Sequence, residues 1–166
     1  RLAARRLKAL GFEVSIDASA LAKHQRFAGD DAVRLAALHR VAASAPSIAL
    51  ATRGGYGLTR LLDRIDWKLV ARSVEAGTRW VGQSDLTVLQ LGLLAHAKGI
   101  TWQGPLACDD FGREAGQGGV DEVTRDCFMA DVPGELEGVG FRTEKGRDGL
   151  GAGGVRWSVA SLDGTS

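Results

Sequence analysis

A serine that follows a glycine in a short apolar context is the residue best suited to chemistry in this chain. The stretch Gly82-Gln-Ser84-Asp-Leu-Thr87 ends an apolar run and opens directly into a pattern with helical spacing. A tight turn from strand to helix exposes a hydroxyl as a nucleophile, beside the unpaired N–H groups of the first helical turn. Leu86 stands where the second glycine of a G-x-S-x-G elbow would be. A second interpretation therefore stays open, in which Ser84 or Asp85 only caps the helix.

A second candidate segment is the glycine loop, Arg53-Gly-Gly-Tyr-Gly57, which follows the apolar run at residues 48–51. Glycines let backbone N–H groups approach a ligand closely, so this loop can stabilise an oxyanion or hold a carboxylate. Arg53 can clamp a carboxylate through its guanidinium fork. The alternative is a plain glycine turn with a solvated arginine. No G-x-x-x-x-G-K-[ST] motif is present, which argues against a nucleotide P-loop.

Helical and strand-like patterns alternate around these two segments. Periodicity predicts helices at residues 2–10, after Asp30 and Asp31, at 58–65, at 68–75, behind Ser84 and at 120–130. It predicts strands at residues 12–16, 48–51 and 100–103, and one further strand that ends at Gly82. This order predicts an α/β fold, a parallel sheet flanked by helices on both faces, Rossmann-like or flavodoxin-like. Such sheets bind ligands at the carboxyl ends of their strands, so the glycine loop and the Ser84 turn are expected to line one crevice.

Composition narrows the class of protein. The chain has 166 residues, 45% of them hydrophobic, and no apolar run approaches the roughly 20 residues that span a membrane, so we expect a soluble domain. The 21 basic and 20 acidic residues are dispersed, which does not favour nucleic acid as a partner. Cys108 and Cys127 fit no metal-ligand spacing, so no metal or cofactor is expected, and free thiols favour the cytoplasm.

The other titratable residues offer no clear partner for the serine. His96 lies about three turns along the helix that the serine opens, about 18 Å away, so it cannot be the base. His39 is expected at the surface or in packing, and His24 lies in a polar connection. Asp85 is expected to cap its own helix. The pair Asp109-Asp110 either faces the cleft or solvates a turn, and the turn is favoured.

Four blocks together resemble a known enzyme family. The blocks are Ala51-Thr-Arg-Gly-Gly-Tyr-Gly-Leu-Thr-Arg-Leu-Leu62, Asp66-Trp67, Trp80-Val-Gly-Gln-Ser-Asp-Leu-Thr87 and Gln103-Gly-Pro105. Their residues, order and spacing resemble those of the LD-carboxypeptidases, serine peptidases that include muramoyltetrapeptide carboxypeptidase. The resemblance covers about residues 1–130. It implies that Ser84 is the nucleophile, that the oxyanion donors are the N–H of Asp85 and that of Gly54 or Gly55, and that Arg53 and Tyr56 bind substrate.

The resemblance also implies an activity and a setting. Family enzymes are cytoplasmic, usually homodimeric and metal-free, and they release the terminal D-alanine of murein tetrapeptides during cell-wall recycling. One branch instead cleaves a peptide-nucleotide antibiotic and confers immunity. A serine hydroxyl needs a hydrogen-bonded base, normally a His oriented by a carboxylate. In this family a His and a Glu from a C-terminal domain supply these two groups.

The two ends of the chain depart from the family pattern. Family members begin with an apolar strand ahead of the first helix and carry a Gly-Gly-Asn-Leu segment where their second domain starts, unlike residues 154–166 here. We therefore expect a nucleophile-bearing α/β domain at residues 1–130, without its first strand. Residues 131–166 are expected to be a Gly-rich linker and tail leading to an absent C-terminal domain. The alternative to an enzyme is a module that binds a peptide carboxylate without turnover.

Overall fold

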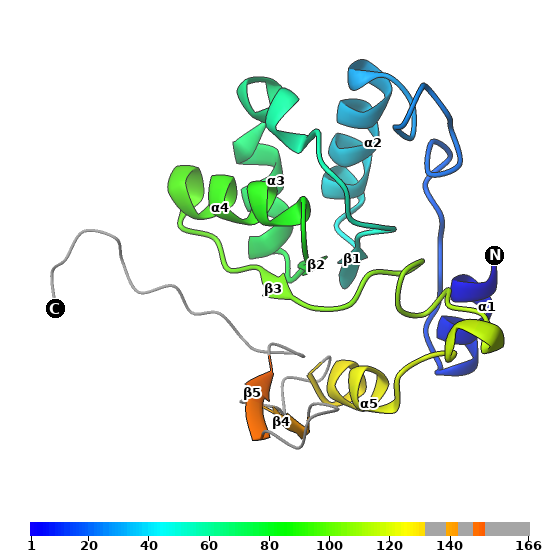
Figure 1. Ribbon diagram of the computed structural model, residues 1–166. Coiled ribbons are helices and arrows are strands. Elements are labelled where there is room, and N and C mark those ends of the chain that lie inside the picture. The colour runs from blue at the N-terminus through cyan, green and yellow to red at the C-terminus, as the bar shows by residue number, and fades with distance from the viewer. Residues whose placement is uncertain (132–138, 143–147, 152–166) are drawn as a thin grey trace, which may run out of the picture.

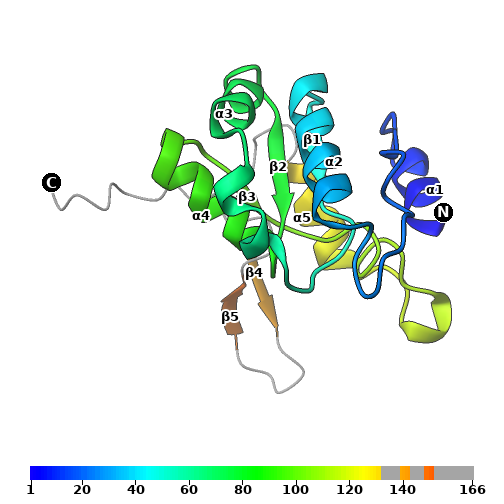
Figure 2. The same ribbon diagram turned by 90° about the horizontal axis from the view of Figure 1, so that it is seen from above.

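Three short parallel strands form the centre of the fold (Figure 1). The structure is a computed structural model, and it describes residues 1–131, 139–142 and 148–151. Strands β1 (Ile48–Leu50), β2 (Arg79–Gly82) and β3 (Trp102–Gln103) pair in that order, with Leu50 opposite Val81 and Val81 opposite Trp102. Helices cover both faces of this sheet, as two perpendicular views show (Figures 1 and 2). The predicted α/β fold with a parallel sheet is confirmed.

Among the described residues, five α-helices surround the sheet. They are α1 (Leu2–Ala9), α2 (Asp31–Ser44), α3 (Trp67–Glu75), α4 (Leu86–Ala97) and α5 (Glu122–Asp131). The same residues include three short 3-10 helices, η1 (Leu58–Arg60), η2 (Leu62–Arg64) and η3 (Ala115–Gln117). The side chain of Asp30 caps α2 by accepting a hydrogen bond from the Val33 N–H at 2.8 Å, as predicted. Asp66 caps α3 in the same way. No helix of the described residues is long and apolar enough to cross a membrane.

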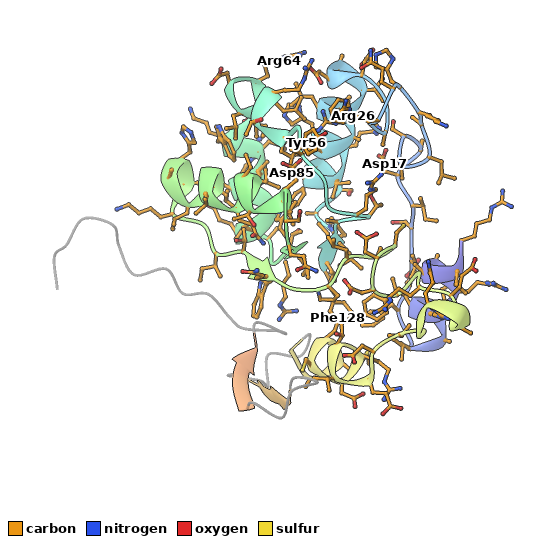
Figure 3. All side chains as sticks on the ribbon, in the orientation of Figure 1. Asp17, Arg26, Tyr56, Arg64, Asp85 and Phe128 are labelled. Atoms are coloured by element: carbon orange, nitrogen blue, oxygen red, sulfur yellow. The ribbon has the colours of Figure 1, made fainter. Side chains whose placement is uncertain are left out.

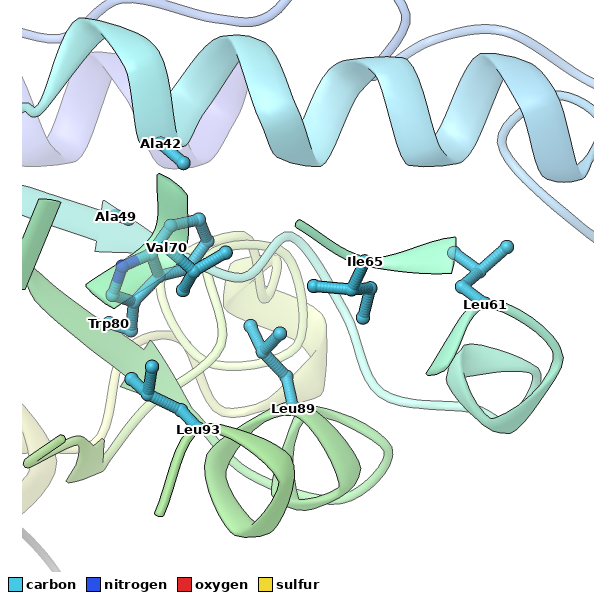
Figure 4. Packing of buried hydrophobic residues seen from close by; sticks show 8 residues of the cluster. All are labelled: Ala42, Ala49, Leu61, Ile65, Val70, Trp80, Leu89 and Leu93. Carbon is cyan, nitrogen blue, oxygen red and sulfur yellow. The ribbon is translucent and has the colours of Figure 1, made fainter. Parts of the chain in front are cut away.

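The larger core lies between the sheet and helices α2, α3 and α4 (Figure 4). Side chains of a strand alternate between the two faces of a sheet, and Trp80 of β2 enters this core while its neighbour Val81 points to the other side. The buried indole N–H of Trp80 donates to the Ser73 hydroxyl at 2.9 Å, and that hydroxyl donates to the Val70 carbonyl. The sheet is therefore fixed to α3 by packing and by a satisfied polar pair.

A second core lies on the opposite face, under α1 and α5. Leu7 of α1, Val81, Trp102 and Phe128 of α5 pack there around Phe111, which is completely buried. The rings of Phe111 and Phe128 meet edge to face, with their centroids 5.2 Å apart. Both faces of the sheet are thus buried, which explains why the strand at residues 48–50 reads as an uninterrupted apolar run.

Two predicted elements take a different form. The strand predicted at residues 12–16 is wrong, because no described segment of backbone pairs with it as a strand. The apolar residues Phe12 and Val14 alternate because both pack against the second core. The helical spacing at 58–65 is formed by the short turns η1 and η2, since Leu61 and Ile65 reach the larger core from 3-10 geometry. Within the predicted linker, β4 (Val139–Arg142) pairs antiparallel with β5 (Asp148–Gly151). Residues 152–166 lie outside the described residues.

Candidate active site

Ser84 lies on the turn between β2 and α4, and its backbone is left-handed. Its φ is +60°, a conformation that serine rarely adopts, and its side chain is exposed. Neither Ser84 nor Asp85 makes a side-chain cap to α4, so the interpretation of this motif as a simple helix cap is wrong. Residues held in such backbone conformations cluster at functional sites, where the surrounding structure maintains them.

The glycine loop meets this turn at Gly54. A Cβ built on Gly54 would lie only 2.9 Å from both the Cβ and the Oγ of Ser84, so the absence of a side chain lets the two loops touch. Gly82 permits a second close approach, because a Cβ there would lie 2.7 Å from Leu86 and 2.9 Å from Ala51. The predicted meeting of these loops at the carboxyl edge of one sheet is therefore observed.

A third loop, residues 104–110 after β3, closes the same edge. Its backbone donates from Gly104 to the Gly82 carbonyl at 3.1 Å, then from Ala107 to the Ala51 carbonyl at 2.9 Å. The Cys108 N–H then reaches the Thr52 carbonyl at 2.7 Å. The loop thus crosses from the end of β2 to the end of β1, and it brings its own polar residues beside the glycine loop.

Two aspartates hold the glycine loop from opposite ends. The Asp85 carboxylate accepts a hydrogen bond from the Leu58 N–H at 3.0 Å instead of capping α4. The expectation of a cap is wrong because Asp85 already has helical backbone angles, φ −60° and ψ −27°, whereas a capping residue is extended. The Asp109 carboxylate accepts from the Gly54 N–H at 3.3 Å, so the turn expected for it is wrong too. Asp110 alone serves that turn, accepting from the Leu106 N–H at 2.6 Å.

These contacts divide the N–H groups near Ser84 into engaged and available ones. The Gly54 N–H is taken by Asp109, and the Leu58 N–H by Asp85. The intervening N–H groups of residues 55–57, like that of Asp85, have no acceptor among the described residues. A loop that ends in two anchored amides and carries free ones between them can receive a negatively charged oxygen.

The two residues implied to bind substrate are both on the surface of this loop. Arg53 is exposed and forms no ion pair with any described residue. Tyr56 is 66% exposed, its hydroxyl accepts from Arg26, and the Arg26 guanidinium lies 5.5 Å from its ring centroid. Figure 3 shows Tyr56 next to Arg26. The polar connection before α2 therefore reaches the site, which sequence reasoning missed.

An ion pair fixes the far side of the glycine loop to α2. Arg60 of η1 contacts the Asp31 carboxylate at 2.7 Å, and its hydrogen bond is the main cause that lowers the pKa of Asp31. Gly57 packs closely in the same region, since a Cβ there would lie 2.7 Å from the Phe27 ring. The loop is thus attached to α2 as well as to α4.

The Ser84 hydroxyl has no hydrogen-bonded base among the described residues. The Ser84 hydroxyl makes no side-chain hydrogen bond in the described part of the chain. His39 accepts from the Asp66 N–H at 3.0 Å, and His96 stacks on Trp67 with ring centroids 4.9 Å apart, so both serve packing and backbone contacts. In the same part, no three metal-binding side chains gather.

The fold and the site define an α/β protein that presents a strained serine at the carboxyl edge of a parallel sheet, against a glycine loop. Residues 1–104 match the LD-carboxypeptidase N-terminal domain. The chain belongs to this family of serine peptidases, as its motifs indicated.

Solved structures agree with this assignment. The muramoyltetrapeptide carboxypeptidase from Oxalobacter formigenes is 32% identical, with a TM-score of 0.72 over 86% of this chain and 46% of its own. An MccF-like protein from Bacillus anthracis is 31% identical, with a TM-score of 0.67 over 78% of this chain and 37% of its own. The microcin C7 self-immunity protein MccF shares the fold at 19% identity and a TM-score of 0.72, over 86% of this chain and 41% of its own. The chain thus spans less than half of the length of these proteins.

Proposed function

We propose that this chain is the nucleophile-bearing part of a serine LD-carboxypeptidase that releases the terminal D-alanine of murein tetrapeptides. The observation that carries the proposal is the contact between the exposed Ser84 side chain and Gly54, beside N–H groups that have no acceptor in the described residues. Family membership and the likeness to a muramoyltetrapeptide carboxypeptidase support the substrate class.

The proposed reaction is an acyl transfer. The Ser84 Oγ attacks the carbonyl carbon of the scissile peptide bond, and a base takes the hydroxyl proton and returns it to the departing amine of D-alanine. The negative charge on the former carbonyl oxygen is received by the N–H groups of Gly55 and Asp85, because the Gly54 N–H is already engaged. Water then hydrolyses the acyl-enzyme.

The exposed cationic and aromatic residues of the glycine loop fit a carboxypeptidase. A terminal D-alanine carries a free carboxylate, and Arg53, which has no ion-pair partner in the described residues, can hold it in a bidentate contact. Tyr56 offers an exposed ring for the peptide. In this proposal the base is a His oriented by a Glu, both from a C-terminal domain, and the complete enzyme is a cytoplasmic homodimer.

Two other functions compete with this proposal. The likeness to the Bacillus anthracis MccF-like protein at 31% identity favours cleavage of a peptide-nucleotide antibiotic by the same serine. The absence of a base for Ser84 among the described residues favours a module that binds a peptide carboxylate without turnover.

Four proteins test the proposal: residues 1–166, these residues joined to the C-terminal half of the Oxalobacter formigenes carboxypeptidase, and the Ser84→Ala variant of each. The assay is release of D-alanine from a murein tetrapeptide, with a peptidyl sulfamoyl-nucleoside as the competing substrate. A serine site that lacks its base keeps only about 10³- to 10⁴-fold over water, so residues 1–166 should show almost no turnover. The joined protein should turn over several orders of magnitude faster and lose this on Ser84→Ala.

Each contrary result has a separate meaning. Release by residues 1–166 that is lost on Ser84→Ala would place the base inside this chain. Exclusive cleavage of the sulfamoyl-nucleoside would assign the immunity activity. If the folded joined protein bound the tetrapeptide without releasing D-alanine, the function would be that of a module that binds a peptide carboxylate without turnover.

A further inference from the structure

Asp109 is the one acidic side chain from the loop after β3 that reaches the glycine loop in the described part of the chain. Its carboxylate accepts from the Gly54 N–H, four residues before the amide that Asp85 holds at Leu58. Asp109 is exposed and stands outside the serine motif. Neither the reaction proposed above nor the Ser84 turn uses it.

Within the segment between these two anchors, Gly55 is the residue with the fewest restraints, since Tyr56 contacts Arg26 and Gly57 packs near Phe27. Gly55 has φ +137°, is exposed, and a Cβ built on it would meet no atom within 4 Å, so the space beside its Cα is open. Glycine loses more conformational freedom on ordering than any other residue. A donor that stabilises an oxyanion has to be oriented before the reaction starts, because its advantage lies in not having to reorganise.

We propose that Asp109 is a positioning residue: by accepting from the Gly54 N–H it fixes the peptide between Arg53 and Gly54, which holds Gly54 against Ser84 and limits where the following Gly55 N–H can point. This inference rests on the proposed serine peptidase function. The Gly55 nitrogen is bonded to the carbonyl carbon of Gly54, the residue whose missing Cβ lets it touch Ser84. Once the Arg53–Gly54 peptide is fixed, only the two backbone dihedrals of Gly54 remain to orient that N–H. Asp85 anchors the other end of the same loop.

The charge of Asp109 makes an indirect role the consistent one. A carboxylate facing the developing oxyanion would repel it, whereas a carboxylate that is bound to the Gly54 N–H can polarise and hold the loop without contacting the substrate. Asp109 therefore acts through the loop. Its removal is expected to weaken stabilisation of the transition state while leaving substrate binding nearly unchanged.

The experiment uses the joined protein with Asp109→Ala and Asp109→Asn, and Asp126→Ala as the matched control. Asp126 is an exposed aspartate on α5, where it pairs only with its neighbour Arg125 among the described residues. Losing an oxyanion donor costs about 10²- to 10³-fold, so loosening one should lower kcat about tenfold in Asp109→Ala, with KM within about twofold. Asp109→Asn keeps an acceptor oxygen and should recover most of kcat. Asp126→Ala should match the unsubstituted protein.

A second measurement needs no activity. In the amide NMR spectrum of residues 1–166, Asp109→Ala should move the Gly54 proton upfield through loss of its acceptor and change the Gly55 resonance, while Asp109→Asn should shift both less. If the joined protein is inactive with every substrate, the proposed function fails and these resonances alone decide the anchoring.

Four results would overturn the inference. They are unchanged Gly54 and Gly55 resonances in Asp109→Ala, an unchanged kcat, a rise in KM alone, which would mean that the carboxylate touches substrate, or an equal loss in Asp126→Ala.

Discussion

The left-handed backbone of Ser84 predicts a measurable conflict between stability and function. A non-glycine residue in this region costs roughly 1–2 kcal/mol, and Ser84→Gly removes that cost, whereas Ser84→Ala keeps it. Glycine also gives the unfolded chain more freedom, which takes back about 0.4–1 kcal/mol. The difference predicts that Ser84→Gly is more stable than Ser84→Ala by about 0.8 kcal/mol, the centre of a range of roughly 0–1.6 kcal/mol, although both lack the nucleophile.

The free energy of unfolding of the two variants is compared by urea titration, with equal slopes required so that the midpoints report stability. The control is Ala36→Gly, an exposed position in the interior of α2, where the same Ala-to-Gly change should have the opposite sign and cost about 1 kcal/mol. The strain argument would be refuted if Ser84→Gly were no more stable than Ser84→Ala while the control behaved as expected. Serine would then occupy this conformation without cost.

Two further predictions concern the scaffold. Gly92→Ala should destabilise by about 1–2 kcal/mol despite the better helix propensity of alanine, because the new Cβ would lie 2.2 Å from the Trp67 ring. The control is Gly116→Ala, whose Cβ meets no atom within 4 Å and which should be neutral to slightly stabilising in thermal unfolding. Asp31→Asn should lower the urea midpoint at pH 6 but much less at pH 3, because a lowered folded pKa means that the contribution of Asp31 is complete above about pH 4 and is lost as the pH falls through that folded pKa. An equal effect of Asp31→Asn at both pH values would show that the hydrogen bond from Arg60 does not set this contribution.

The elements that the sequence predicted well are those in which local chemistry and burial agree. The helix at Asp31–Ser44 has a capping side chain at Asp30 and an apolar face, and the strand at Ile48–Leu50 is buried on both sides. The strand expected at residues 12–16 has the right alternation, but a strand exists only where another backbone pairs with it, and among the described residues none does. An alternating pattern indicates only that one side of a segment is buried, and Phe12 is buried by packing its ring against Phe128 without any strand pairing.

In the site, too, some contacts could be predicted from the sequence and others could not. Ser84 and Gly54 could be brought together from sequence, because residues that follow parallel strands must meet at one edge, and this rule needs no knowledge of side chains. The partners of Asp85 and Asp109 could not, because both residue types cap helices and turns as readily as they bind a distant amide. Which role an aspartate takes depends on its backbone angles and on which loop crosses nearby. At Asp109 the deciding fact is the return of residues 104–108 along the ends of β2 and β1, a path set by backbone hydrogen bonds that leave no mark in the local sequence.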